Sequence, residues 1–235
     1  MVEVRFRTDL RSQPIIRTTL RNELTELGDE LNIANEPSQI GDSSRSLLRT
    51  ISKSRANYWA SYVVDFSCPV LFAYLGMRHR PTWPSLIVGF LFGVFVFTLV
   101  EYSIHRWLLH DPRSILFQAH EAHHLNPEMP SAFLFPASFM VLMPIWLLLV
   151  DLLRIPGASF FLCGFSAAYF YYGALHHFEH TTRINQIPFR WLQGRWAAHS
   201  VHHKRDNRNY GVMTSFWDHV FKTHQKYRKQ KGLTA

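Results

Sequence analysis

The sequence predicts an all-α protein, an integral membrane helical bundle of about four transmembrane helices with a cytoplasm-facing, histidine-rich helical cap. Three observations lead to this fold class. Four apolar runs of about bilayer length lie between residues 61 and 175, most histidines lie just outside the ends of these runs, and the C-terminal segment is strongly basic. Long apolar runs are typical of membrane-crossing helices, because a helix satisfies its own backbone hydrogen bonds in lipid.

The clearest predicted span is Ser85–Ile104, whose only charged residue, Glu101, lies near its end. As a helix it would be roughly 30 Å long, which matches the hydrocarbon core of a bilayer. Three further runs are predicted to span the membrane: Ser61–Met77, Ala132–Leu153 and Pro156–Leu175. The first of these is the weakest, because it carries Asp65 and Pro69. Four such runs within about 120 residues disfavour the alternative of a water-soluble protein with long buried helices.

Short connections that contain prolines, Arg78–Pro84 and Arg154–Pro156, join the spans in pairs. Each pair is therefore expected to form a tight helical hairpin, which places the N-terminal segment, residues 105–131 and the C-terminal segment on one side of the membrane. Residues 181–235 contain eleven Lys and Arg but only two acidic residues. Basic segments beside spans stay in the cytoplasm, so a multi-pass protein with both termini and the cap in the cytoplasm is predicted, in a bacterial inner membrane or the endoplasmic reticulum. Nucleic-acid binding, the other use of a basic segment, explains none of the spans.

The polarity of the sequence also divides the chain. Residues 1–57 are polar and are predicted to form a mobile or surface-lying N-terminal segment without catalytic residues. Residues 58–235 are predicted to form the membrane-embedded catalytic domain. The two cysteines, Cys68 and Cys163, lie within apolar runs, which favours buried thiols over a disulfide or a metal site.

Histidine spacing is the strongest functional signal. Thirteen of the fourteen histidines lie between His105 and His224, and eleven of them form four groups. The groups are His105 and His110; His120, His123 and His124; His176, His177 and His180; and His199, His202 and His203. Residues at i, i+3 and i+4 share one face of a helix, so the second and fourth groups can each present three imidazoles to a metal centre. His105 and His110 are about 140° apart on an ideal helix, and this pair would need a helix end between them.

Ten histidines are therefore candidate metal ligands. They are His105, His110, His120, His123, His124, His176, His180, His199, His202 and His203. His177 points about 100° away from His176 on a helix, and it is ranked below its neighbour. His79, His219 and His224 are interpreted as ordinary solvated or hydrogen-bonded side chains.

The number of imidazoles predicts two metal ions with about five ligands each, because ten are too many for one ion. Zinc would indicate hydrolysis, and no companion nucleophile or oxyanion motif stands out in the sequence. Iron with open coordination positions activates O₂, and a membrane supplies apolar substrates. These considerations favour iron, with zinc as the alternative metal.

Glu101 is a candidate supporting residue, since it lies four residues before His105 on the same helical face. Its carboxylate could accept the free ring N–H of that ligand and fix the ring's tautomer. The alternative is a plain acid at the membrane interface. Asp218 and Glu179 are weaker candidates of the same type.

These motifs resemble the fatty acid hydroxylase and sterol desaturase superfamily. The matching segments are Glu101–His110, His120–His124, His176–Thr181, Ala198–His203 and Asn209–Asp218. The resemblance implies a cytoplasm-facing dimetal centre of two iron ions held by the ten candidate histidines, although members of the family have been seen with zinc. It also implies O₂-dependent hydroxylation or desaturation of a lipid. The electrons would come from a separate donor, such as a cytochrome b5-like protein, a ferredoxin or a reductase.

The leading hypothesis is a membrane lipid hydroxylase. A sterol or fatty acid desaturase and a carotenoid hydroxylase are alternatives with the same chemistry, and the segment Asn209–Asp218 favours the acyl and sterol group. A metal transporter or metal-binding membrane protein is the alternative of a different class. It is disfavoured because transport sites lie near the bilayer midplane, whereas the histidines lie outside the apolar runs.

Overall fold

Every regular element in the part of the chain that the structure describes is a helix, as the sequence predicts. The computed structural model describes residues 50–51, 54–114, 116–127 and 136–227, so most of the predicted N-terminal segment lies outside it. In chain order the elements are α3 (Arg55–Met77), α4 (Trp83–Ile104), the π-helix η1 (His105–Leu109), α5 (Phe117–Leu125), α6 (Ala137–Trp146), the π-helix η2 (Leu147–Leu152), α7 (Ala158–Thr181), the 3₁₀-helix η3 (Ile184–Gln186), α8 (Arg190–His202) and α9 (Phe216–Val220).

Within the described residues, three helical segments are long and apolar enough to cross a membrane: Arg55–Met77, Trp83–Leu109 and Ala158–Thr181. The fourth apolar helix, Ala137–Leu152, is shorter, and the predicted count of about four spans is not confirmed. At about 1.5 Å per residue this helix reaches only about 24 Å, less than the hydrocarbon core. The predicted run Ala132–Leu153 begins within residues 128–135, which lie outside the described residues.

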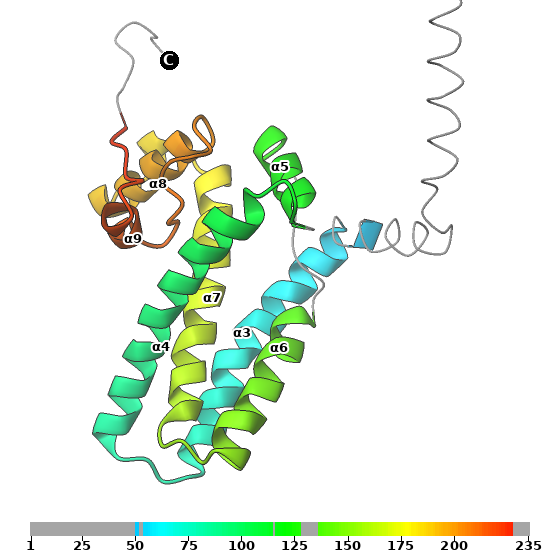
Figure 1. Ribbon diagram of the computed structural model, residues 1–235, viewed down its shortest axis with the longest axis vertical. Helices are drawn as coiled ribbons and strands as arrows, with labels where there is room; N and C mark the ends of the chain where they lie inside the picture. The colour runs from blue at the N-terminus through cyan, green and yellow to red at the C-terminus, as the bar shows by residue number, and fades with distance from the viewer. Residues whose placement is uncertain (1–49, 52–53, 115, 128–135, 228–235) are drawn as a thin grey trace, which may run out of the picture. The chain divides into compact units, whose positions relative to one another are not determined.

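The four apolar helices run alongside one another, with α7 packed along both α4 and α3 (Figure 1). Glycines allow α4 and α7 to approach closely. A Cβ atom on Gly93 would overlap the carbonyl oxygen of Phe161, and a Cβ atom on Gly164 would overlap the carbonyl oxygen of Phe90. Small residues of this kind let helix backbones come together in lipid. The helix that continues into η1 with His105 and the helix that carries His176 and His180 are therefore held at short range.

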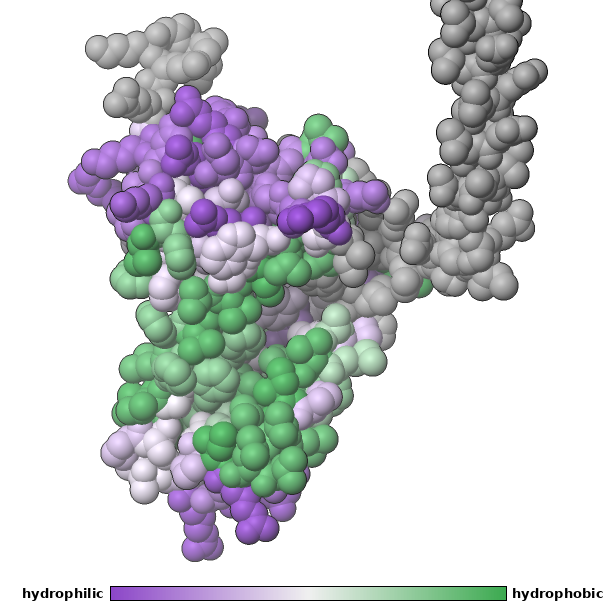
Figure 2. Space-filling view, in the orientation of Figure 1, coloured by the Kyte–Doolittle hydropathy of each residue, from purple (hydrophilic) through white to green (hydrophobic). Residues whose placement is uncertain are grey.

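The outer surface of the bundle is apolar along its length. Figure 2 shows a hydrophobic band that covers the helices between hydrophilic ends. Val63, Phe66, Val88, Leu91 and Met140 lie on these helices and are each more than half exposed. Such a surface is unfavourable in water but matches the interior of a bilayer, so the protein is an integral membrane protein.

The core between α3, α6 and α7 contains both cysteines as free, buried thiols. They pack with Phe72, Trp146 and Leu162. This confirms that they are neither a disulfide nor part of the histidine groups.

The helices α5, α8 and α9 form a cap at one end of the bundle, and the two hairpin connections lie at the other end (Figure 1). The second connection turns into α7 at Gly157, which has a left-handed φ of 77° that favours glycine. The cap lies over the ends of α4 and α7. The polar segments after both helices are therefore brought to one face, as the hairpin topology predicts.

Candidate metal centre

A π-helix accommodates the five-residue spacing of the first histidine pair. The helix continues without interruption from α4 into η1 and ends at Leu109, and His110 follows with a non-helical φ of −101° and ψ of 5°. The expected helix end between His105 and His110 therefore lies directly before His110. A π-helix makes i to i+5 hydrogen bonds, which brings residues five apart toward the same side. The two ring centroids are 5.3 Å apart.

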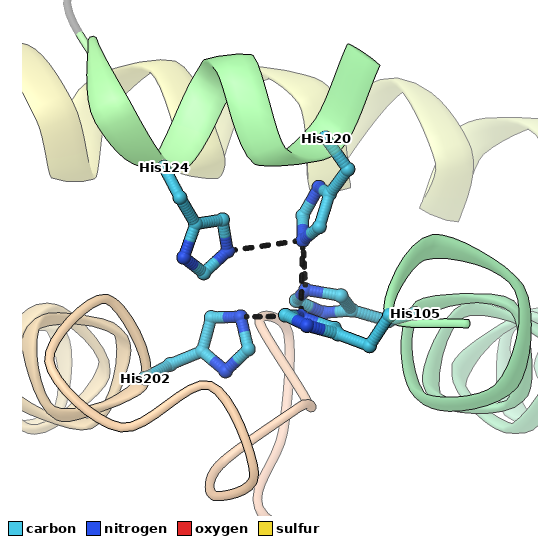
Figure 3. Close-up of side chains that lie close together, drawn as sticks. His105, His120, His124 and His202 are labelled. Carbon is cyan, nitrogen blue, oxygen red and sulfur yellow. Dashed lines mark hydrogen bonds between the residues drawn. The ribbon is translucent and has the colours of Figure 1, made fainter. Parts of the chain in front are cut away.

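Five histidines from the end of α4, from α5 and from α8 form a first histidine group. Its members are His105, His110, His120, His124 and His202. The Nε2 atoms of His105 and His120 are 3.1 Å apart. The Nε2 atoms of His110 and His202 are 3.2 Å apart, and those of His120 and His124 are 3.0 Å apart. Figure 3 shows these rings pointing toward one another from three different segments.

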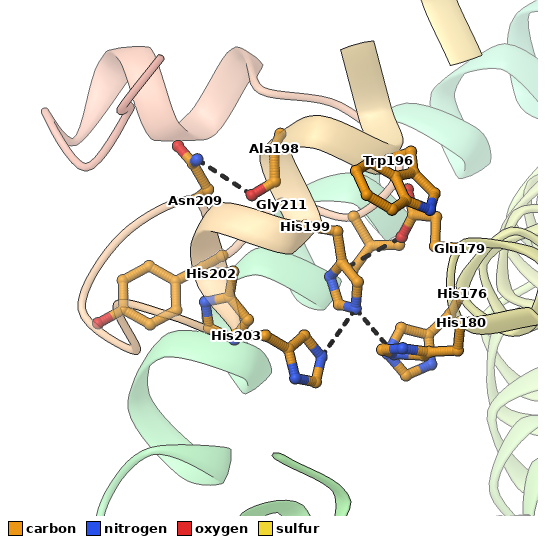
Figure 4. A network of polar contacts seen from close by, with 12 residues as sticks. His176, Glu179, His180, Trp196, Ala198, His199, His202, His203, Asn209 and Gly211 are labelled. Atoms are coloured by element: carbon orange, nitrogen blue, oxygen red, sulfur yellow. Dashed lines mark hydrogen bonds and ion pairs between the residues drawn. The ribbon is translucent and has the colours of Figure 1, made fainter. Parts of the chain in front are cut away.

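The other five candidate histidines form a second histidine group. Its members are His123, His176, His180, His199 and His203. The Nε2 atom of His199 lies 2.9 Å from that of His180 and 3.0 Å from that of His203 (Figure 4). Both α5 and α8 contribute to both groups. The three histidines of each motif are thus divided between two sites, whereas their spacing predicted that all three share one helix face.

The spacing of the ring nitrogens fits a metal ion in each group. Two nitrogens bound to one ion at right angles, with bonds of about 2.1 Å, would be about 3.0 Å apart. The observed Nε2 separations are 2.9 to 3.2 Å. The ligand atoms of each group all lie within 4.8 Å of one another.

Backbone carbonyls fix the tautomer of two rings in the first group. The Nδ1–H of His105 donates to the carbonyl oxygen of Tyr210, and the Nδ1–H of His202 donates to that of Arg208. A neutral imidazole protonated at Nδ1 presents only a lone pair at Nε2. Lone pairs that face one another repel, and a cation placed between them removes the repulsion. The donor set therefore suits a metal centre.

Burial keeps the histidines outside the membrane spans in the neutral form that binds metal. Burial, with a smaller effect of His124, lowers the pKa of His110 to about 4. Burial and the neighbouring His180 lower the pKa of His123 to about 3, and burial and His124 lower the pKa of His203 to about 2. A metal ion would therefore not have to compete with a bound proton at neutral pH.

Two carboxylates hold the loop whose carbonyls receive these ring protons. Asp218 accepts the backbone N–H groups of Tyr210 at 2.9 Å and Gly211 at 3.0 Å. Glu101 accepts the backbone N–H of Val212 at 2.7 Å. The proposed contact of Glu101 with the ring of His105 is thus replaced by an indirect one, because the carbonyl of Tyr210 takes that ring proton. Asp218 and Glu101 both support the first group through the loop.

Sequence reasoning missed the carbonyls of Arg208 and Tyr210, because a backbone acceptor has no residue signature. The indirect signal is Asn209 between them. Its φ of 51° is left-handed, a conformation that Asn adopts more readily than most residues. Its amide also donates to the carbonyl oxygens of Ala198 and Gln225, which fixes the loop against α8.

A different environment surrounds the second histidine group. His199 Nδ1 lies 3.8 Å from Glu179 Oε2 (Figure 4). Glu179 lies within the third histidine motif on α7, between His177 and His180, and is buried. Arg195, one turn before His199 on α8, donates to Ser215 through one guanidinium nitrogen. Among the described residues, neither carboxylate oxygen of Glu179 has a hydrogen-bond partner.

The four histidines that were not predicted to bind metal lie outside both groups. The Nδ1 atom of His177 is 2.7 Å from the hydroxyl of Tyr58. The rings of His219 and His224 stack on each other with centroids 4.1 Å apart. His79 lies in the turn between α3 and α4, at the opposite end of the bundle.

Comparison with known proteins gives consistent matches over the same region. Residues 90–223 match the family model described as fatty acid hydroxylase. A dihydroceramide fatty acyl 2-hydroxylase of Arabidopsis thaliana is 31% identical over 151 residues, which cover 60% of this chain and 62% of that protein. A ceramide very long chain fatty acid hydroxylase of Schizosaccharomyces pombe is 31% identical over 160 residues, covering 62% of this chain and 45% of that protein.

A solved structure described as full-length scs7p, with only the hydroxylase domain visible, matches with a TM-score of 0.62 and 26% identity. The match covers 77% of this chain and 71% of that one. The chain spans about half the length of the curated relatives it matches.

Proposed function

Because the chain belongs to the fatty acid hydroxylase family, we propose that it is a membrane lipid hydroxylase that inserts one oxygen atom of O₂ into a C–H bond of an acyl chain. The observation that carries the proposal is the pair of five-histidine groups at the membrane end of the cap. The two relatives described above are named as hydroxylases of fatty acyl chains in ceramides or dihydroceramides. Ceramide-type or related acyl lipids are therefore the proposed substrate class.

The ten histidines of the two groups are the proposed ligands of two iron ions, one in each group. Imidazole suits iron, zinc and copper alike, and iron is proposed over zinc because the reaction is a redox reaction. The two iron ions would supply the reductive activation of O₂. The chain's own part is to present neutral imidazoles at fixed spacing and to hold the outer ring nitrogens of His105 and His202 with backbone carbonyls.

The reaction needs electrons as well as O₂. In balanced form, RH, O₂, two electrons and two protons give ROH and one water. We propose that the electrons come from a separate carrier, such as a cytochrome b5-like protein, a ferredoxin or a reductase. The basic C-terminal segment favours a cap that faces the cytoplasm, and this is the side on which we propose that the donor binds.

The depth of the histidine groups supports oxidation near the polar end of an acyl chain. His105 lies at the end of α4 and His180 near the end of α7, where the apolar band of the surface gives way to the hydrophilic cap (Figure 2). In a bilayer, the carbons next to a lipid headgroup occupy this depth. The second carbon of an acyl chain, which the name of the Arabidopsis thaliana relative specifies, would therefore reach the centre while the rest of the acyl chain stays in the membrane.

Expression in a host without acyl 2-hydroxylation, followed by lipid mass spectrometry, tests the proposal. We expect new lipids that are heavier by one oxygen, carry label from ¹⁸O₂, and are absent with the His202→Ala variant. New lipids that lack two hydrogens would identify a desaturase instead, and hydroxylated rings after β-carotene feeding would identify a carotenoid hydroxylase. If no oxygenated or desaturated lipid forms in several hosts, while vesicles that contain the protein take up metal ions, the proposal is wrong.

A further inference from the structure

The two histidine groups differ in what receives their outer ring protons. In the first group, two rings donate from Nδ1 to neutral backbone carbonyls, those of Tyr210 and Arg208. In the second group, the Nδ1 atom of His199 faces the carboxylate of Glu179 at 3.8 Å. The side chains of His199 and Glu179 are only 4% and 1% exposed. Backbone carbonyl dipoles therefore accept the ring protons of the first group. The second group lies next to the carboxylate of Glu179, which is shielded from water.

The atoms around Glu179 are buried but not hydrogen-bonded. Within the described part of the chain, both oxygens of Glu179, the Nδ1 atom of His199 and the Nη1 atom of Arg195 lack a partner. A buried ionisable group without partners is costly. Glu179 and His199 face each other from α7 and α8 (Figure 4), and the positive charge of Arg195 on α8 acts on this carboxylate. A small shift that closes the 3.8 Å gap would give a partner to the Nδ1 atom of His199 and to one oxygen of Glu179.

Metal binding would favour the approach of His199 to Glu179. A histidine that binds an ion through Nε2 carries its ring proton on Nδ1. In His199 that proton points at Glu179 and has no other acceptor in the described residues. Hydrogen bonds of this type are about 2.7 to 2.9 Å long, so the two atoms have to approach by only about 1 Å.

We propose that Glu179 is the positioning residue of the second metal site: it accepts the Nδ1–H of His199, while Arg195 balances its charge. The inference rests on the proposed function, because it needs metal at the histidines. A carboxylate behind a ligand makes the imidazole a stronger donor than a carbonyl does. The two metal positions are therefore chemically inequivalent, and Glu179 controls only the second.

Glu179→Gln is the central variant, because it removes the charge and keeps the shape. Glu121→Gln is the matched control: Glu121 also lies beside a candidate ligand, His120, but is exposed. The purified, metal-loaded full chain is titrated with a chelator, and the retained metal is measured by elemental mass spectrometry. A sample loaded with ⁵⁷Fe is examined in parallel by Mössbauer spectroscopy.

We expect the wild-type protein and Glu121→Gln to retain two ions per chain. Glu179→Gln should release one ion at roughly 10- to 100-fold lower chelator concentration, the usual effect of losing a supporting partner, and should hold the other normally. One of the two iron signals should change in the spectrum. If Glu179→Gln released both ions at the wild-type chelator concentration and its spectrum were unchanged, Glu179 would be only a packing residue.

Glu179→Met separates folding from metal binding if Glu179→Gln is unstable. It fills a similar volume without polar atoms, and such replacements of buried charges are often neutral or stabilising. The melting temperature of its metal-free form should be at least that of the wild-type protein, yet it should lose the same single ion. Retention of both ions by Glu179→Met would overturn the inference. A wild-type protein that holds no metal would overturn the proposed function as well.

Discussion

His123 and His124 are neighbours in the chain, yet they belong to different histidine groups. Consecutive residues on a helix point about 100° apart, and α5 lies so that this angle divides its histidines between the two sites. The same division occurs on α8, where His202 belongs to the first group and His203 to the second. At the scale of single residues, each histidine therefore has an assigned site, and a substitution should affect one site first.

The first prediction uses this assignment. His202→Ala should weaken metal binding in the first group, and His123→Ala should weaken it in the second, because each removes one of five proposed ligands. We expect losses of at least about 10- to 100-fold in affinity and loss of hydroxylation, measured by elemental mass spectrometry and product analysis. His224→Ala should change neither. His177→Ala should keep near-normal metal with partial activity, and loss of metal in that variant would contradict the assignment.

The second prediction concerns Asp218, which accepts hydrogen bonds from Tyr210, Gly211 and Thr223. Asp218→Asn replaces an acceptor by an amide that faces a donor, and each unsatisfied buried group costs about 1–3 kcal/mol. We expect a lower melting temperature and weaker metal binding in the first group. Asp206→Asn, an exposed acid of the same loop, is the control. Equal melting temperatures for the two variants would show that Asp218 does not hold the loop.

The spacing of the histidines predicted the ten residues that come together, and their number predicted two sites of about five ligands, but the sequence did not assign each histidine to a site. Spacing determines which residues share a face of one helix. The side of the helix that faces each site depends on how α5 and α8 pack on the bundle, and this is a tertiary property. The carbonyls of Arg208 and Tyr210 were also beyond prediction, because every residue has a carbonyl group and only the fold selects two of them.

At the scale of elements, the apolar runs predicted the helices well, and their irregular parts poorly. The helix was predicted to end between His105 and His110, and it ends at Leu109, but the π-helical form of its last turn was not predicted. Hydrophobic periodicity does not distinguish i+4 from i+5 hydrogen bonding over a single turn. The short helix Ala137–Leu152 ends in a second π-helix, which the sequence also did not indicate.

The third prediction tests the contact between α4 and α7. Gly93→Ala places a methyl group against the carbonyl of Phe161, so the helices must separate. Overpacking of this kind costs about 1–3 kcal/mol, and it should also loosen metal binding, because the two helices position His105 and His176. Gly173→Ala is the control, since nothing lies within 4 Å of its added Cβ. The comparison is made by melting temperature and metal content in detergent. Equal melting temperatures for the two variants would contradict the close approach.

For the whole molecule, the fourth prediction concerns the pH dependence of the metal-free protein. In the unfolded chain His110 has its ordinary pKa of 6.5, and in the folded protein its pKa is lowered to about 4. The folded pKa values of His123 and His203 are lower still, at about 3 and 2. Below pH 6.5 the unfolded chain therefore binds more protons than the folded one, and stability must fall as pH falls.

Thermal unfolding of chelator-treated protein between pH 7.5 and 5 tests whether stability falls as the pH falls. The melting temperature should be nearly constant above pH 6.5 as far as these histidines are concerned, and should decline below it. His110→Gln should decline less steeply, because one such histidine is removed. A melting temperature that rises as the pH falls would mean that the histidines are not buried in the folded protein.

The chain order of the two histidine groups also determines when each site is completed during synthesis. Both groups require α8, through His202 in the first and His199 and His203 in the second. A nascent chain emerges N-terminus first, and its early elements can fold before the later ones exist. The apolar helices α3, α4, α6 and α7 are therefore made, and can enter the membrane, while neither site is complete. Loading of the proposed metal centre would therefore follow the synthesis of α8, and a chain truncated before Arg190 should insert in the membrane without a complete pair of histidine groups.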